Sequence, residues 1–355
     1  MRVSVQAFES PRPLRLAVVG LGRWGRNVLR DFGSCPEVRV VGLCDQRSEQ
    51  LEAAASRFPA ARIYPDMNEL LELCSAEAVA VCTPAETHAD LVIQALESGR
   101  HVFVEKPLAL SHRDALRLVQ LARARQRVLA VGHQLLHYWP VAWLAAVLES
   151  GVLGAVYRVD MQRHNCGPGT VGVGPWWDLA PHDLSVLTHL FGAQVRLLSM
   201  SPEPGDGAAA HLLCDDEVEV VISCRLAAVE RRRRVLIEGS GGLAVWDESS
   251  GSPQLELQQR TGRGRLRSVE PTSLPGLRAF KGLLAAPQAV PQPLKLQCQE
   301  FVTCALDGAE PYGSGRRALE IVRLLEQGQQ LQISGRQPLM AGSQALPKGQ
   351  RPRLI

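Results

Sequence analysis

The stretch that decides the fold is L14-R-L-A-V-V-G-L-G-R-W-G25. It joins an apolar run typical of a buried strand to the motif G20-L-G-R-W-G25, and a helical pattern begins at Trp24. In this context Gly20 permits a tight turn, Gly22 lets main-chain amides approach a pyrophosphate, and Gly25 lets the helix pack closely on the strand. We therefore predict a dinucleotide site, with the side chains of Arg23 and Trp24 beside it. A glycine turn without a ligand is the alternative.

An acidic residue follows the next predicted strand, residues 38–43. Asp45 lies 20 residues after Gly25, where a carboxylate can accept both hydroxyls of an adenosine ribose and repel a 2′-phosphate. The spacing predicts NAD as the cofactor. Arg47 could instead bind the phosphate of NADP, so NADP stays open, and a turn or capping role for Asp45 is a further alternative.

Strand-like and helical patterns alternate as far as residue 131. A capping box, Ser111 with Asp114, opens one of the helices, and Leu116, Val119 and Ala122 have the spacing of its buried face. The other predicted elements are strands at 78–83, 101–105 and 128–131 and a helix at 88–97. This alternation is typical of an α/β fold with a doubly wound parallel sheet, so we predict a Rossmann domain over residues 14–135, after an N-terminal extension, residues 1–13.

The pattern then changes to successive strands separated by turns. They predict an α+β domain with an open, mostly antiparallel sheet over residues 136–336. The predicted strands are residues 155–163, 195–200, 208–214, 218–226, 233–239 and 243–247. Residues 261–293 are expected to be a long surface loop, followed by helices at 294–306 and 316–327 and by a disordered tail, residues 337–355.

Composition excludes several classes of protein. Hydrophobic residues make up 46% of the 355 residues and charged residues 21%, with a net charge of +3, so neither a disordered chain nor a nucleic-acid-binding protein is favoured. The longest apolar run, residues 138–148, contains a proline and is too short to cross a membrane, and no signal peptide is visible. Nine scattered cysteines without CxxC spacing favour the reducing cytoplasm.

Polar residues cluster where two predicted parallel strands end. V81-C-T-P-A-E-T-H-A-D-L91 and H101-V-F-V-E-K-P-L-A-L110 bring several of them to the ligand-binding edge of the sheet. Those that we assign to the cofactor are Thr83, Pro84, His88 and Glu105. Lys106, between a buried strand and a proline, has little access to bulk water and is the candidate general base, oriented by Glu105. A surface lysine before a helix-breaking proline is the alternative.

At this point the chain resembles a known family, the glucose-fructose oxidoreductase, inositol dehydrogenase and MocA group (Gfo/Idh/MocA). The resemblance rests on GLGRWG (20–25), CTPAETH (82–88) and EKPLA (105–109). It implies a Rossmann domain followed by an α/β domain, and an NAD(P)-dependent dehydrogenase or reductase acting on a CH–OH carbon of a sugar or polyol. Lys106 would be the lysine of the family's E-K-P motif.

The resemblance continues in W176-W-D-L-A-P-H-D-L-S185, which is similar to the family's D-x-x-x-H element. It implies that His182 and Lys106 are the acid/base pair and that Asp178 anchors the substrate or orients His182. We also assign Trp176 and Trp177 to substrate binding, and we expect Pro181 in a first helical turn. No metal is expected. A metal held by Asp178, His182 and His189, or a helix cap with an exposed histidine, are the alternatives.

The substrate is less well defined by the sequence. WDLAPHDLS (177–185), with EGSGGLAVWD (238–247), looks most like nucleotide-sugar members such as UDP-N-acetylglucosaminuronate 3-dehydrogenases, although residues 227–234 lack the proline-lysine pairing of those relatives. A free aldose, inositol or other polyol dehydrogenase, or a catalytically silent dinucleotide-binding regulator, are the alternatives. The partners implied are a small-molecule sugar and further copies of the chain, as a homodimer or homotetramer, with no nucleic acid and no membrane.

Three further features have candidate roles. The glycine-rich residues 165–174 could close over a ligand or form a simple connection. After the last Rossmann strand, Gln134 is expected at the nicotinamide end of the cleft and His133 in the core with its hydrogen bonds satisfied. On a strand, Arg231 to Arg234 divide two and two between its faces, either solvated or complementing a diphosphate or another acidic group.

Overall fold

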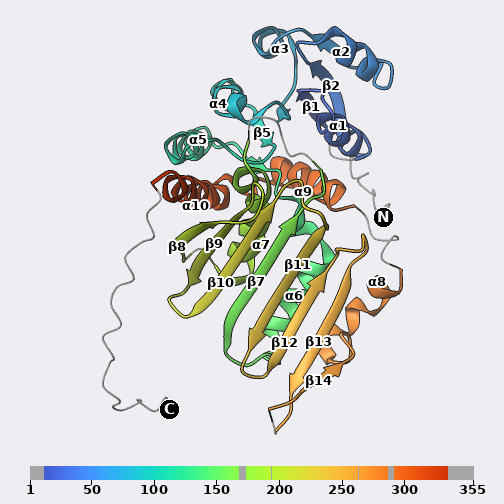
Figure 1. The fold of residues 1–355 in the computed structure, drawn as a ribbon. Coiled ribbons are helices and arrows are strands. Elements are labelled where there is room, and N and C mark those ends of the chain that lie inside the picture. The colour runs from blue at the N-terminus through green and yellow to red at the C-terminus, as the bar shows by residue number, and fades with distance from the viewer. Residues whose placement is uncertain (1–11, 168–172, 193, 263, 287–291, 335–355) are drawn as a thin grey trace, which may run out of the picture.

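The computed structural model describes residues 12–167, 173–192, 194–262, 264–286 and 292–334. Figure 1 shows two sheets, one above the other, with helices α9 and α10 lying between them. Most of the predicted N-terminal extension, the predicted tail and part of the glycine-rich stretch 165–174 lie outside the described residues. No helix in the described part of the chain is long and apolar enough to cross a membrane.

The first sheet is parallel throughout, with the strand order β3-β2-β1-β4-β5-β6. Its strands are β1 (Leu14–Val19), β2 (Val38–Cys44), β3 (Arg62–Tyr64), β4 (Ala78–Val81), β5 (His101–Val104) and β6 (Leu129–Val131). The helices between them are α1 (Gly25–Gly33), α2 (Ser48–Ala55), α3 (Met67–Leu73), α4 (His88–Glu97) and α5 (His112–Ala124). The order reverses between β1 and β4, and ligands bind at that point in doubly wound sheets.

Helix α5 corrects one expectation. Ser111 caps it as predicted, because its side chain accepts a hydrogen bond from the amide of Asp114. The buried face, however, is formed by Ala115, Leu118 and Ala122, whereas Leu116 is exposed. The predicted face was therefore out of phase at its first turn.

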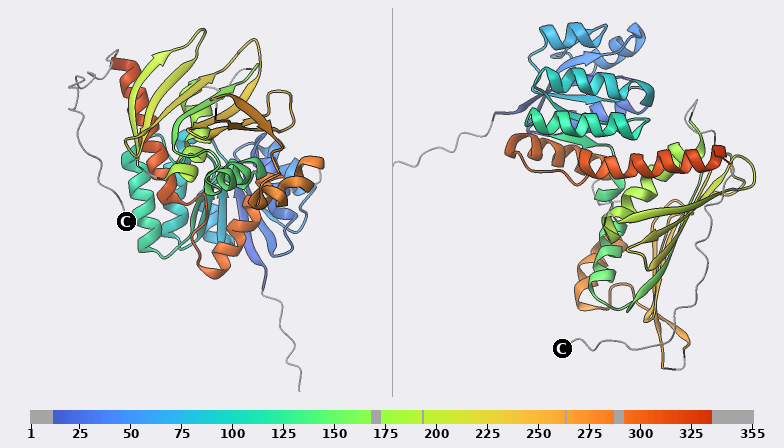
Figure 2. Two further views of the ribbon diagram at one scale, coloured as in Figure 1. Left: turned by 90° about the horizontal axis from the view of Figure 1, so that it is seen from below. Right: turned by 90° about the vertical axis from the view of Figure 1, so that its left-hand side faces the viewer.

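The second sheet has the order β14-β13-β12-β11-β7-β10-β9-β8. Its strands are β7 (Val156–His164), β8 (Val195–Pro202), β9 (Ala208–Cys214), β10 (Val218–Arg225), β11 (Arg232–Gly239), β12 (Gly242–Asp247), β13 (Gln254–Arg260) and β14 (Leu266–Val269). All neighbours are antiparallel except β7 and β10, so the prediction of a mostly antiparallel sheet is confirmed. Helices α6 (Trp139–Glu149) and α7 (Pro175–Phe191) pack on one face (Figure 2).

The prediction that residues 261–293 form a long surface loop was wrong. The segment contains β14, the 3-10 helix η3 (Pro275–Phe280) and the short helix α8 (Lys281–Ala285), while residues 287–291 lie outside the described part. Two other 3-10 helices, η1 (Ala85–Thr87) and η2 (Gln134–His137), lie near the ends of first-sheet strands.

The last two helices return to the first sheet. Helix α9 (Pro293–Asp307) packs against α1, and Phe301 makes edge-to-face contacts with Phe32 and Phe103 at ring-centroid distances of 5.8 and 5.9 Å. Helix α10 (Gly315–Ser334) contacts α5 in the upper unit and α7 and β8 in the lower one. Figure 2 shows α10 crossing between the two units, so the C-terminal helices tie the two sheets together.

Candidate active site

The glycine turn after β1 fits a dinucleotide. Gly20 has a φ of +85°, and a Cβ there would lie 2.7 Å from the main chain of Cys82. A Cβ on Gly25 would lie 1.8 Å from the carbonyl oxygen of Gly20, so this position requires glycine to close the turn. At Gly22, by contrast, the nearest atom to a Cβ is the end of the Arg47 side chain at 3.4 Å. The amides of residues 22–24 donate to no acceptor among the described residues, which leaves them for a pyrophosphate at the start of α1.

Asp45 is buried beside this turn. Its Oδ2 accepts a hydrogen bond from the amide of Leu21 at 2.7 Å, and its Oδ1 accepts one from the amide of Arg47 at 2.9 Å. The Arg47 guanidinium also pairs with the carboxylate at 3.2 Å. Burial alone would raise the pKa of Asp45, but the hydrogen bonds from Arg47 and Leu21 outweigh it and hold that pKa below its ordinary value. Asp45 is therefore ionised, and Arg47 is already paired to it.

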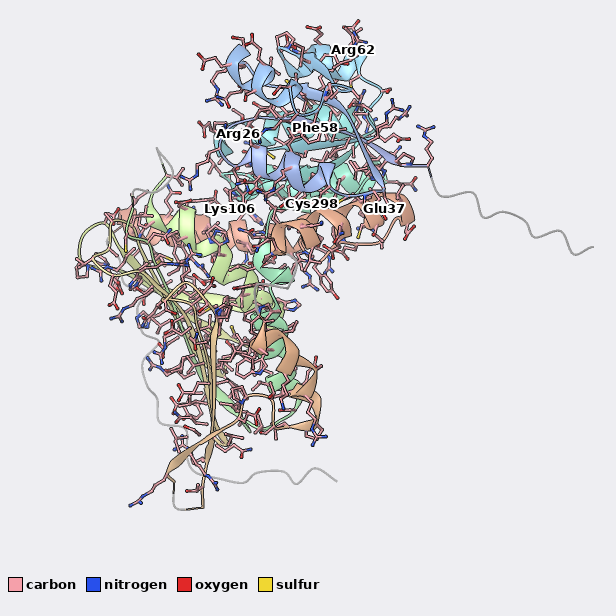
Figure 3. All side chains as sticks on the ribbon, turned by 90° about the vertical axis from the view of Figure 1, so that its right-hand side faces the viewer. Arg26, Glu37, Phe58, Arg62, Lys106 and Cys298 are labelled. Carbon is pink, nitrogen blue, oxygen red and sulfur yellow. The ribbon has the colours of Figure 1, made fainter. Side chains whose placement is uncertain are left out.

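A cavity of about 610 Å³ opens between the two units. It contains ten of the predicted site residues: Arg23, Trp24, Thr83, Pro84, Glu105, Lys106, Gln134, Trp177, Asp178 and His182. Three further polar residues line it: Arg163, which the sequence did not point to, Asn165 of the glycine-rich stretch 165–174, and Arg233 of the arginine run 231–234. Figure 3 labels Lys106 at the junction of the upper and lower units.

Lys106 makes the central contact of the cavity. Its Nζ donates to the carboxylate Oδ1 of Asp178 at 3.0 Å and to the main-chain carbonyl of the same residue at 2.8 Å. The Lys106 side chain is 19% exposed, so its ammonium group lies in the cavity wall instead of extending into solvent. Two oxygens of Asp178, in the first turn of α7, thus hold the ammonium of a lysine that follows β5.

Glu105 does not orient Lys106 as predicted. Its Oε1 accepts a hydrogen bond from the indole Nε1 of Trp24, and its Oε2 accepts one from the Lys106 main-chain amide at 3.2 Å. A Cβ on Gly132 would lie 2.7 to 3.0 Å from the carboxyl group, so that glycine makes room for it. Burial raises the pKa of Glu105 to about 7, because the charged form has lost its water.

Helix α7 starts earlier than the sequence indicated. It begins at Pro175, so Pro181 lies inside the helix and not in its first turn. Since proline has no amide hydrogen, the carbonyl of Trp177 receives no helical hydrogen bond from position 181. The interior proline therefore interrupts the hydrogen-bond ladder directly beside Asp178, whose carbonyl accepts the Lys106 hydrogen bond.

The two tryptophans differ in position. The Trp177 ring lines the cavity and donates to the side chain of Gln329 on α10 at 2.8 Å. Trp176 is buried against α10, where its indole donates to the carbonyl of Leu325 at 3.0 Å, and it does not line the cavity. Its predicted substrate contact is therefore wrong, and it anchors α7 to α10.

Two buried histidines lie near Lys106. Burial, then Lys106 and Arg163, lower the pKa of His182 well below its ordinary value, so its imidazole is neutral. Its Nδ1 has no hydrogen-bond partner in the described structure. His133 was expected to be satisfied, but neither of its ring nitrogens has a partner, and burial followed by Lys106 lowers its pKa to about 3.

His88 and His189 lie outside the cavity lining. His88 is buried, and its ring nitrogens lie 2.7 Å from the carbonyl oxygen of Pro107 and 3.0 Å from that of Thr83, so it links the loops after β4 and β5. His189 lies nearly two turns beyond His182 on α7 and contacts Tyr312 and Arg317. The structure therefore does not bring it to the metal site considered as an alternative.

Comparison with known proteins agrees with this geometry. The Gfo/Idh/MocA family model, described as an oxidoreductase family with an NAD-binding Rossmann fold, matches residues 14–133. The dTDP-3,4-didehydro-2,6-dideoxy-alpha-D-glucose 3-reductase of Streptomyces violaceoruber is 32% identical over 258 residues, which are 62% of this chain and 72% of that protein. The D-apiose dehydrogenase of Paraburkholderia graminis is 26% identical over 87% of this chain and 85% of its own length.

Solved structures share the whole fold. The WlbA dehydrogenase of Bordetella pertussis, solved in complex with NADH and UDP-GlcNAcA, superimposes with a TM-score of 0.79 over 92% of this chain and 97% of its own, at 20% identity. The arrangement of both sheets is thus common to the two proteins. Because a relative 32% identical is covered over 72% of its length and the family model begins at β1, the chain belongs to the Gfo/Idh/MocA family of oxidoreductases.

Proposed function

We propose that the chain is an NAD(P)-dependent dehydrogenase or reductase that acts on a CH–OH carbon of a sugar. The observation that carries the proposal is the anchored ammonium of Lys106, which shares one cavity with the neutral imidazole of His182 beside the glycine turn. A nicotinamide, when bound, supplies or accepts the hydride. The remaining steps belong to the protein's own residues.

The first of these steps is cofactor binding. The free amides of residues 22–24 hold the pyrophosphate, and the carboxylate of Asp45 receives the adenosine ribose. We propose NAD as the preferred cofactor, because Asp45 is ionised and the nearby Arg47 is already paired with it. Thr83, Pro84, Glu105 and Gln134 line the route from the turn to Lys106.

The second step is movement of the hydroxyl proton. Lys106 and His182 form the acid/base pair in this proposal, and a neutral imidazole can take up the proton during oxidation and return it during reduction. The positive charge of Lys106 stabilises an alkoxide as it develops on the substrate. Asp178 orients Lys106 through the 3.0 Å ion pair.

The class of sugar has two candidates. A nucleotide sugar is favoured by the name of the Streptomyces reductase and by the UDP-GlcNAcA bound to WlbA. A free sugar is favoured by the D-apiose dehydrogenase, which matches this chain over more of its length than the Streptomyces reductase does. Assay of each sugar with and without its nucleotide separates them.

We also propose separate roles for the two domains and an oligomeric assembly of the chain. Residues 14–135 bind the dinucleotide and residues 136–336 bind the substrate, although α9 completes the core of the first unit. The face of the second sheet opposite α6 and α7 (Figure 1) is proposed to pair two copies of the chain, in a homodimer or homotetramer.

All nine cysteines are free thiols, which supports a reducing compartment such as the cytoplasm.

The experiment is an absorbance assay of reduced nicotinamide with NAD, NADP, UDP-sugars and free polyols. Lys106→Met is expected to reduce turnover by about a hundredfold or more, because general acid–base groups contribute on that order. Dinucleotide affinity, measured by the fluorescence of Trp24 in the cavity wall, should be retained. Lys281→Met, at an exposed lysine of α8, is the matched control. Wild-type turnover by Lys106→Met on a confirmed substrate would refute the proposal.

A further inference from the structure

One arginine of the run 231–234 differs from its neighbours. Side chains alternate between the two faces of a strand, and on β11 the exposed faces carry Arg232 and Arg234, each with an acidic partner. Arg232 pairs with Glu230 at 3.1 Å, and Arg234 lies 3.7 Å from Asp247. Arg233 points to the opposite face and lines the cavity that contains Lys106. The three arginines of the run that lie on β11 thus provide one internal cation and two external cations with acidic partners.

A second arginine lies beside Arg233 inside the cavity. Arg163 on β7 is its direct cross-strand neighbour, so both guanidinium groups lie on one face of the sheet. Arg163 is neutralised by Asp183, which accepts two hydrogen bonds from it at 2.8 and 2.9 Å, and both side chains are almost completely buried. Its charge is therefore already used in a structural ion pair.

Arg233 has no such partner. No carboxylate of the described residues forms an ion pair with it, and its Nε is buried without a hydrogen-bond acceptor. Its side chain makes one hydrogen bond, from a terminal nitrogen to Oδ1 of Asn165 at 3.4 Å. Glu248 is the carboxyl group that acts on it most strongly, but burial raises the pKa of Glu248, which also hydrogen-bonds with Tyr138.

The positive charge of the Arg233 guanidinium is unfavourable in this cavity as long as no anion is bound to it. Burial, then the neighbouring Arg163, lower the pKa of Arg233, which shows that the surroundings oppose its charge. A planar guanidinium with a free edge is suited to two parallel hydrogen bonds from an oxyanion. The cavity wall contains four cationic side chains, of Arg23, Lys106, Arg163 and Arg233, but only the carboxyl groups of Glu105 and Asp178.

We propose that Arg233, assisted by Asn165, binds an oxyanion that the substrate itself carries, either a carboxylate on the sugar or a phosphate attached to it. The inference rests on the proposed function, because it assigns a substrate class to the same cavity. Lys106 and His182 receive the reacting hydroxyl, while Arg233 on the second sheet holds the charged end of the same molecule. Arg233 is in this sense a specificity-determining residue, and neutral sugars are poor substrates.

The test compares Arg233→Gln with the matched variant Arg234→Gln, one position along the strand on its exposed face. Calorimetric binding to the intact chain without dinucleotide is measured for glucose, glucuronate, glucose 1-phosphate and UDP-glucose. Arg233→Gln is expected to lower the binding affinity for sugars that carry an oxyanion by about 30-fold or more, since one partner of a buried charge pair is lost. Arg234→Gln should bind the sugars as the wild type does. Arg233→Lys keeps the charge but loses the planar guanidinium with its paired donors, so its affinity should lie between those of the wild type and Arg233→Gln.

The four sugars of the test identify the source of the oxyanion, and the test separates the oxyanion site from the proposed enzymatic function. An effect confined to glucuronate assigns a carboxylate, and one confined to the phosphorylated sugars assigns a phosphate. Unchanged binding by Arg233→Gln, or no binding of any anionic sugar by the wild type, overturns the inference. Absence of turnover with every sugar overturns the proposed function instead, and a binding loss specific to Arg233→Gln still supports the oxyanion site. Arg233→Gln should melt no lower than the wild type, because the variant removes an uncompensated charge, so a loss of binding cannot be ascribed to unfolding.

Discussion

The substitution Glu105→Gln provides a quantitative test of the cavity's electrostatics. The carboxyl group of Glu105 is buried between Trp24, the amide of Lys106 and Gly132, and its pKa is about 7 instead of 4.5. The folded protein therefore holds this proton between about pH 4.5 and pH 7, whereas the unfolded chain releases it. Stability falls as pH rises through this range, and the cost is complete above about pH 7.

The size of the effect follows from the two pKa values. A difference between 4.5 and about 7 corresponds to about 3 kcal/mol of unfolding free energy lost between pH 4 and pH 8. Glutamine has nearly the same shape and no charge, so it should abolish this component of the pH dependence. Its carbonyl can still accept from Trp24, but its NH₂ group faces the Lys106 amide, which costs about 1 kcal/mol at every pH.

Urea unfolding followed by tryptophan fluorescence at pH 4, 6 and 8 measures both terms. We expect Glu105→Gln to be less stable than the wild type at pH 4 and more stable at pH 8, by about 1 and about 2 kcal/mol. The two stability curves should therefore cross. Glu97→Gln, at an exposed end of α4, is the control and should follow the wild type. Parallel curves for Glu105→Gln and the wild type would refute the assignment of a raised pKa to Glu105.

Three further substitutions test other parts of the site. Gly25→Ala places a Cβ 1.8 Å from the carbonyl oxygen of Gly20 and should weaken dinucleotide binding by about tenfold or more in a fluorescence titration; wild-type affinity would show that the turn can relax. Asp183→Asn leaves the buried Arg163 without its counter-charge and should lower the unfolding free energy by about 3 to 5 kcal/mol in urea, whereas a change below about 1 kcal/mol would indicate a solvated pair. Asp45→Ser should raise the ratio of NADP to NAD affinity by about tenfold, because a ribose acceptor and a repulsive charge are removed together; an unchanged ratio in parallel titrations argues against the NAD assignment.

Strand β3, with two of its three residues exposed, was not predicted. The other five strands of the first sheet could be predicted because most of their residues are buried. Such strands appear in the sequence as unbroken apolar runs, as in β4, where all four residues are buried. The glycine motif added the position of the first turn, and Ser111 the start of α5. The buried face of α5 could not be assigned in the same way. Leu116, Leu118 and Val119 are all apolar, so the sequence pattern fits more than one helix face.

The elements missed in the second unit have weaker signals. Strand β14 is mostly exposed and forms an edge of the sheet in the described structure, next to β13, so it has no alternating apolar pattern. The cavity residues Arg163 and Arg233 come from strands far apart in the sequence, and they become neighbours only through the register of β7 with β11. Local spacing carries no information about that register. The Lys106–Asp178 pair could be anticipated only as two residues of one site, since 72 positions separate them.

The return of α9 to the first unit has a consequence for biosynthesis. Phe32 and Phe103 leave the ribosome early, but the ring that covers them, Phe301, is made only after all strands of the second sheet. The nascent N-terminal half therefore exposes an apolar corner throughout the synthesis of the second sheet. A fragment ending at residue 135 would retain this exposed corner permanently, so it should need a chaperone or aggregate, whereas the full-length chain covers the corner itself when α9 emerges.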